Sequence, residues 1–215
     1  MAFSEAQIKQ LIKLDGYNPS KIPKLEEYLL QTCRGDAPYV FDGVRVLIKL
    51  YTLFPAKAND TNMAYACLVT FLNDRDSLLA LQYMIPMSTQ KQEPSRTILS
   101  CSELLSACRY PEFWTAFESL QKSSDSVIQK MTQSSVSSLQ SVILSTLALS
   151  YRKAPLPLVL RSLNSTALPT TKECAIEGKD TVVFAATANN TKRERAYQEG
   201  VNFSTVSGLL QKMAQ

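Results

Sequence analysis

The stretch "RYPEFWTAFESL" (residues 109–120) concentrates aromatic side chains and holds the only tryptophan of the chain. If Pro111 opens a helix, Phe113, Phe117 and Leu120 fall on one side of it, and Trp114 extends that apolar stripe. Three uses of the stripe are open: packing between helices, contact with a partner protein, or a platform on which nucleic-acid bases stack.

The charges around this stretch favour packing over stacking. A single-strand platform combines aromatic rings with a basic groove that follows the phosphates. Arg109 and Lys122 flank the stretch, but Glu112 and Glu118 lie between them, so the local net charge is near zero. The sequence therefore predicts that these rings fill a helical core.

Amphipathic helical patterns continue on both sides of the stretch, through residues 1–150. Ser4 followed by Gln7 is a capping-box signature for a helix over about residues 4–14. Further helices are expected within residues 18–31, 41–55, 59–73, 76–86, 94–108, 111–121 and 134–153.

A weak repeat runs through these helices. Cys33, Cys67 and Cys101 are 34 residues apart, and each lies late in, or midway along, an apolar helix that a second one follows. Periods in this range are typical of helix-hairpin solenoids, in which each pair buries its apolar face against its neighbours. Residues 1–150 are therefore predicted to form a helical repeat domain.

The pattern changes near residues 150–155, where "SYRKAPLPL" interrupts the helices with two prolines. Short helices are expected at 155–164 and 170–176, strands at 179–187 and 192–203, and a closing helix at 204–214. This order is typical of a winged-helix module. The predicted fold is thus mostly α, with a small α+β winged-helix domain over residues 151–215.

Two absences exclude much enzyme chemistry. The chain has no histidine, which removes imidazole-based triads and H-E-x-x-H zinc sites. Its six glycines are too far apart for a glycine-rich phosphate loop. Glu26, Glu27, Asp74 and Asp76 are expected on the solvent side of a helix or at a helix cap. No catalytic, cofactor or metal residues are predicted, and the chain is not expected to be an enzyme.

The cysteine content and the distribution of charge limit the compartment and the kinds of partner that are expected. Five cysteines without a C-x-x-C spacing suit buried thiols in a reducing compartment, so a cytosolic or nuclear protein is expected. No secretory signal or apolar run long enough to cross a membrane is found. Residues 1–150 hold 14 basic and 14 acidic side chains, and residues 151–215 hold 9 and 5, so the whole net charge of +4 lies there.

One basic cluster stands out, "TKRERAYQ" at residues 191–198. Lys192, Arg193 and Arg195 have the chemistry to contact an RNA backbone from a wing. The alternative is a solvated loop whose charge Glu194 dilutes, and this is the reading favoured by the residues alone.

Four stretches together resemble one family. They are "DGYNPSKIPKLEEYLLQ" (15–31), "LIKLYTLFP" (47–55), "RTILSCSELLSACRYPEFWTAFESL" (96–120) and "VNFSTVSGLL" (201–210). In order and spacing they resemble the subunit K family of the eukaryotic translation initiation factor 3 complex. The most specific pieces are the Tyr-Asn-Pro turn at 17–19, the ending at Pro55 and the Phe-Trp pair at 113–114.

The resemblance implies a HEAT-like helical repeat domain followed by a winged helix, in a PCI-like arrangement. It implies a non-catalytic cytoplasmic scaffold that binds other subunits, notably subunit L, in the complex that joins the small ribosomal subunit. The family brings no catalytic or cofactor residues. The alternative function is direct RNA binding through residues 192–195.

The resemblance weakens over residues 164–180, where Pro169 interrupts the region of the expected recognition-like helix. A groove-reading role for the winged helix is therefore doubtful. In PCI-type assemblies such domains pair through strand and helix edges, and Val182, Val183 and Phe184 suit that use. These three residues are the expected partner-binding site.

Overall fold

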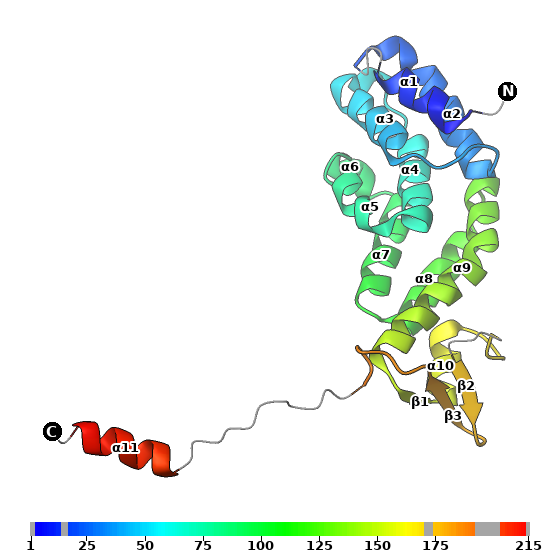
Figure 1. Cartoon of the computed structure of the whole chain (residues 1–215). Helices are drawn as coiled ribbons and strands as arrows, with labels where there is room; N and C mark the ends of the chain where they lie inside the picture. Colours follow the sequence, from blue (N-terminus) through cyan, green and yellow to red (C-terminus); the bar gives the residue numbers. More distant parts are fainter. Residues whose placement is uncertain (1–2, 14–16, 170–173, 192–202, 214–215) are drawn as a thin grey trace.

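The structure is a computed structural model that describes residues 3–13, 17–169, 174–191 and 203–213 (Figure 1). In these residues the chain is mostly α-helical with one small antiparallel sheet, as predicted at this coarse level. The α-helices are α1 (Glu5–Lys13), α2 (Ile22–Arg34), α3 (Phe41–Leu53), α4 (Asp60–Asn73), α5 (Arg75–Gln82), α6 (Met87–Gln90), α7 (Ser95–Ser106), α8 (Tyr110–Gln121), α9 (Ser126–Ser150), α10 (Leu156–Leu163) and α11 (Phe203–Met213). Two 3-10 helices are η1 (Pro19–Lys21) and η2 (Pro55–Lys57), and the strands are β1 (Lys153–Pro155), β2 (Cys174–Glu177) and β3 (Thr181–Phe184).

The helix ends follow the local signals in the sequence. The Ser4 amide donates to Gln7 Oε1 at 2.9 Å and the Gln7 amide donates to Ser4 Oγ at 3.3 Å, which is the reciprocal pair of a capping box. Asp74 caps α5 by accepting from the Ser77 amide at 3.2 Å. Both capping predictions are confirmed.

The three cysteines of the weak repeat lie in helices that stack in sequence order. Cys33 is in α2, Cys67 in α4 and Cys101 in α7, and all three side chains are buried. Helix α2 contacts α4, and α4 contacts α7, while each packs on the helix that follows it. The three helices that carry the cysteines therefore pack on one another in order, and the repeat itself stays a prediction.

Burial of these thiols predicts a loss of stability at alkaline pH. It raises the pKa of Cys33, Cys67 and Cys101 from 9.0 to about 12. The unfolded chain therefore releases these protons at a lower pH than the folded chain. The stabilising contribution is complete below pH 9.0 and is lost as pH rises from there towards 12. Each thiol should cost roughly 1 kcal/mol per pH unit in that window.

The test is urea unfolding at a series of pH values between about 8 and 11. The free energy of unfolding should fall with rising pH, and Cys67→Ala should make the fall shallower. Leu149→Ala, at an exposed side chain that carries no titratable group, is the control and should leave the slope as it is. An equal slope in wild type and Cys67→Ala would contradict the prediction.

Helix α9 is the longest helix described and packs against α2, α4, α8 and α10. Asp125 fixes its first turn. One carboxylate oxygen accepts from the Val127 and Ile128 amides at 2.8 and 3.3 Å, and the other accepts from the Tyr65 hydroxyl at 2.7 Å. Since Tyr65 belongs to α4, this single side chain caps α9 and ties it to the helical stack.

The sheet has the strand order β1–β3–β2, with both pairs antiparallel. Residues 174–177 form a strand, so the helix predicted over 170–176 is wrong there. A turn at Gly178, whose φ of +73° suits glycine, joins β2 to β3. The strand predicted at 192–203 falls almost entirely outside the described residues, and β1 was not predicted.

One hydrophobic core runs from the helices into the sheet. The buried cluster that contains Phe113 and Trp114 also contains Val159 of α10 and Val182 and Phe184 of β3. The side-chain amide of Asn190 donates through Nδ2 to the Ala148 carbonyl at 2.8 Å. This bond ties the chain after β3 to the end of α9. These contacts hold the sheet against α8–α10.

Candidate partner-binding surface

The aromatic stretch lies inside the protein. Phe113 and Phe117 are fully buried and Trp114 is 4% exposed. The Phe113 and Phe117 rings stack with their centroids 5.4 Å apart, and Trp114 meets both edge-on. The indole N–H donates to the Ser162 carbonyl at 2.8 Å, so this side chain joins α8 to α10. The prediction of core packing is confirmed.

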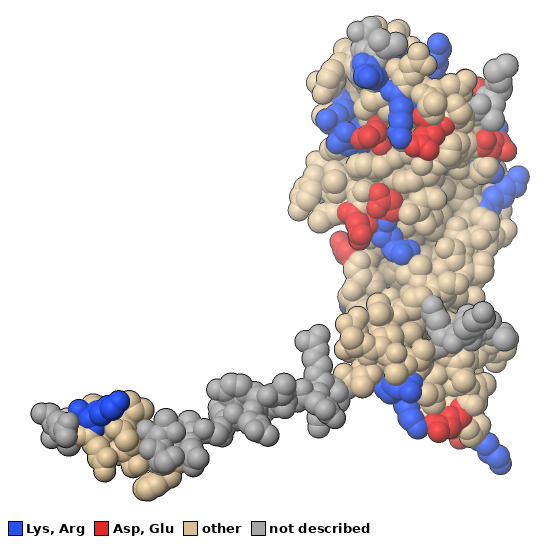
Figure 2. Space-filling model, in the orientation of Figure 1, with Lys and Arg blue, Asp and Glu red and all other residues tan. Residues whose placement is uncertain are grey.

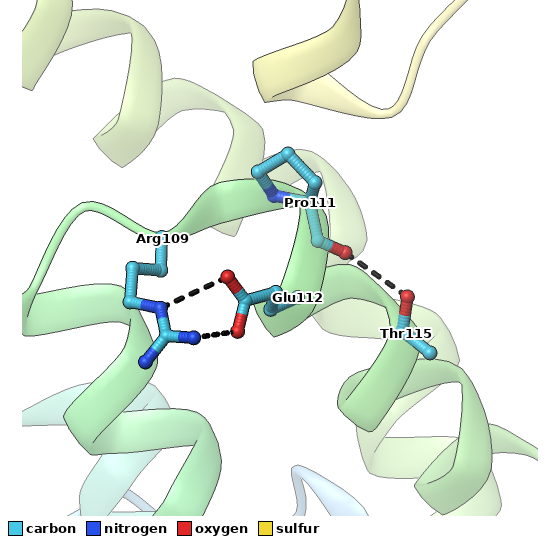
Figure 3. Close-up of polar contacts among 4 residues, drawn as sticks. All are labelled: Arg109, Pro111, Glu112 and Thr115. Atoms are coloured by element: carbon cyan, nitrogen blue, oxygen red, sulfur yellow. Dashed lines mark hydrogen bonds and ion pairs between the residues drawn. The ribbon is translucent and has the colours of Figure 1, made fainter.

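The polar groups at the start of α8 satisfy one another at the surface (Figure 3). Arg109 Nε donates to Glu112 Oε1 at 2.9 Å, and a second contact joins the same two side chains. The Thr115 hydroxyl donates to the Pro111 carbonyl at 3.0 Å. Arg109 is thus paired with a carboxylate, and the rings beside it face the core, so this segment offers no stacking platform.

The candidate carboxylates do not form a site. Glu26 was expected to face solvent but is half-buried. Its Oε1 accepts hydrogen bonds from the Tyr51 hydroxyl and, at 3.1 Å, from the side-chain amide of Asn62. It therefore links α2, α3 and α4. No group of three or more His, Cys, Asp or Glu side chains in the described residues is placed to hold a metal ion.

Residues 182–184 do not lie at a sheet edge. β3 is the central strand, paired on one side with β1 and on the other with β2. Val182 and Phe184 are fully buried in the core, and only Val183 is partly exposed. The expectation that these three residues form an exposed edge is wrong, because β1 supplies a strand that the sequence did not reveal. Their role in partner binding stays a prediction.

Among the described strands, β1 and β2 are therefore the edges of the sheet. β1 contacts α10, and Pro155 has no amide N–H to donate. β2 is the more accessible edge: Ala175, Ile176 and Glu177 are exposed, and Ile176 keeps 54% of its surface in solvent. An edge strand with an exposed apolar side chain can pair with a strand of another chain.

A salt bridge marks the sheet face that carries Val183. Lys153 of β1 lies directly opposite Val183, and Glu177 of β2 lies opposite Thr181, so all four share one face. The Lys153 ammonium contacts the Glu177 carboxylate across β3. This exposed pair covers part of the face and leaves the outer side of β2 open.

The basic cluster cannot be placed. Lys192, Arg193 and Arg195 lie outside the described residues. On the face in Figure 2, basic side chains of the described residues stand beside acidic ones at both ends of the molecule, with no continuous basic stripe. No helix in the described part of the chain has the length and apolar character to cross a membrane.

The chain is similar to several known proteins, and one reported match covers most of its length. A relative from Dictyostelium discoideum is 33% identical over 107 residues, which are 49% of this chain and 43% of the relative. One from Bos taurus is 30% identical over 115 residues, covering 53% and 52%. One from Xenopus laevis is 24% identical over 212 residues, covering 95% and 94%. All three are named eukaryotic translation initiation factor 3 subunit K.

The chain is similar to subunit K. The resemblance stated from its sequence is thereby confirmed. The chain spans about half or less of the length of the first two relatives, whereas the third match is nearly end to end. No family model matches the chain.

Proposed function

We propose that the chain is a non-catalytic scaffold subunit of the cytoplasmic translation initiation factor 3 complex. Its near full-length similarity to a protein named subunit K carries this proposal. The stacked helix pairs support a HEAT-like repeat domain over 1–150. The order β1, α10, β2, β3 supports a winged helix in the domain over 151–215.

Within this proposal, the chain binds subunit L and reaches the small ribosomal subunit through the complex. The open edge of β2 is the contact for subunit L, and Val182, Val183 and Phe184 support it from the central strand. Backbone pairing along the edge would supply affinity, and the exposed Ile176 would supply an apolar anchor.

Ile176→Asp tests the edge. Ile176 is already half exposed, so the substitution should leave the fold intact while placing a charge in the paired strand. The matched control is Leu149→Asp, because Leu149 on α9 is 52% exposed. Loss of a central anchor costs about 2 kcal/mol, so binding of purified subunit L should weaken about thirtyfold for Ile176→Asp and stay unchanged for Leu149→Asp.

Calorimetric titration of each variant with subunit L gives the affinities. If Ile176→Asp binds as tightly as wild type, β2 is not the contact, while failure of wild type itself to bind would reject subunit L as the partner. Phe184→Asp is unsuitable, because that side chain is fully buried and the variant would unfold.

RNA contact through Lys192, Arg193 and Arg195 stays the alternative, and no contact among the described residues favours it. Binding of a labelled RNA at two salt concentrations distinguishes it, because phosphate contacts weaken steeply with salt.

A further inference from the structure

A second surface, far from β2 in sequence, carries exposed apolar side chains around an open groove. The groove has a volume of about 420 Å³ and is lined by Tyr17, Lys49, Thr52, Leu53, Tyr83 and Met84. These come from the second residue before η1, the last turns of α3 and the two residues after α5. Helices α3 and α5 contact each other, and Figure 1 shows both on the side of the molecule away from α9.

No described residue covers the apolar side chains of this lining. Tyr17, Leu53 and Tyr83 are 66%, 55% and 81% exposed, and Leu79 and Met87 beside them are exposed as well. Isolated apolar side chains are ordinary on a protein surface, but several around one groove indicate an interaction site. Tyrosine is also one of the residues that most often anchors an interface.

The floor of the groove is held in place. The Thr52 hydroxyl lies 3.0 Å from the Ile48 carbonyl and 3.2 Å from the Met84 carbonyl, and its single O–H is shared between them. The contact with Met84 joins the end of α3 to the segment after α5, on opposite sides of the groove. Because this contact joins the two segments before a partner arrives, binding loses less conformational entropy in the groove.

Lys49 sets the charge of the partner. It is the only charged residue of the lining, and it makes no ion pair with any described residue. Two other cations of α1 and α3 do form ion pairs: Lys9 pairs with Glu5, and Arg45 pairs with Asp42. A segment that combines apolar side chains with a carboxylate fits both features of the groove.

Among the described residues, helix α11 has the required shape but the wrong charge. Helix α11 exposes Phe203, Val206, Leu210 and Met213 in an apolar row. Its only charged residue is Lys212, which would face Lys49 with like charge. A second copy docking through α11 is therefore disfavoured.

We propose that the groove of Tyr17, Lys49, Leu53 and Tyr83 binds an acidic amphipathic peptide segment of another protein. Apolar side chains of the segment lie against the two tyrosines and Leu53, and a carboxylate of the segment pairs with Lys49. This is the helix-in-groove mode of recognition, with charge setting the choice of partner. The site is separate from the β2 edge, so Ile176→Asp should leave it unaffected.

The test uses fluorescein-labelled helical peptides and the full chain, with anisotropy as the readout. One peptide has leucine and phenylalanine along one face and glutamates elsewhere. A second has lysines in place of the glutamates, a third has serines in place of the apolar residues, and a fourth is the sequence 203–213. The acidic amphipathic peptide should bind at least about fivefold more tightly than each of the others.

Two substitutions then locate the site. Tyr83→Ser should weaken binding of the acidic peptide about tenfold, because that side chain is 81% exposed and its loss leaves the core untouched. Lys49→Glu should reverse the preference between the acidic and the basic peptide. Leu149→Ser, exposed but outside the groove, is the control and should change neither result.

Any one of four outcomes would overturn the proposal. The first is equal binding of the acidic and basic peptides, and the second is equal loss in Tyr83→Ser and Leu149→Ser. The third is binding of peptide 203–213 as tightly as the acidic peptide, which would instead assign the groove to a second copy of the chain. Absence of binding by every peptide would overturn it as well.

Discussion

Replacing Trp114 with alanine should lower the free energy of unfolding by about 3–5 kcal/mol, the range for removing a large buried aromatic side chain. Trp114 is 4% exposed and packs edge-on against Phe113 and Phe117, so its loss leaves a cavity between α8 and α10. The Ser162 carbonyl, which accepts from the indole at 2.8 Å, would also lose its partner. Both effects act at the junction between helices and sheet.

Trp114→Phe separates the two contributions. A phenylalanine keeps most of the packing but cannot donate to Ser162, so it should cost about 1–3 kcal/mol. Tyr83→Ala is the control for loss of an exposed ring and should stay within about 0.5 kcal/mol of wild type. Urea unfolding followed by far-ultraviolet circular dichroism gives all three values. A Trp114→Ala variant as stable as Tyr83→Ala would show that the indole is not a core residue.

Local patterns in the sequence predicted most of the helices. The Ser4–Gln7 capping box and the Asp74 cap act within three residues, so the sequence contains the whole interaction. Trp114 was assigned to the core because the charges around it cancel and its aromatic neighbours share one side of a helix. Such predictions succeed where the deciding atoms lie within one or two turns.

The sheet was predicted less well, because its strands depend on distant partners. β1 and β2 have three and four residues, too few to show an alternating pattern. β2 is a strand because Cys174 lies opposite Phe184 and Ile176 opposite Val182, a pairing that no local signal contains. With β1 missed, β3 was mistaken for an edge.

The surfaces proposed for binding were also not predictable from local sequence patterns. Tyr17, Leu53 and Tyr83 are more than 25 residues apart in sequence, and each taken alone looks like an ordinary member of an amphipathic helix or turn. Glu26 likewise looked like a surface carboxylate until folding brought Tyr51 and Asn62 to it. Exposure and pairing are properties of the folded chain, and single positions in a sequence do not encode them.

Gly43→Leu should destabilise the chain by about 3 kcal/mol, although leucine forms helices better than glycine does. Gly43 lies in α3 beneath the second core cluster, which Ile8 of α1 and Tyr28 of α2 form. A β-carbon at this position would lie 2.9 Å from Cε1 of Tyr28 and 3.0 Å from Cγ2 of Ile8. Gly43→Ala should cost about 1 kcal/mol, and leucine more.

The cost depends on whether the Tyr28 ring can move aside, and two hydrogen bonds hold it. Its hydroxyl donates to the Pro38 carbonyl at 3.0 Å and accepts from the Val40 amide at 2.8 Å. Gly208 of α11 is the matched control, because a β-carbon there meets nothing within 4 Å. Gly208→Leu should therefore show no loss in urea unfolding, and only its gain in helix propensity should remain. Equal stabilities for the two leucine variants would mean that the Tyr28 ring moves aside. The packing of α1, α2 and α3 would then not require a glycine at position 43.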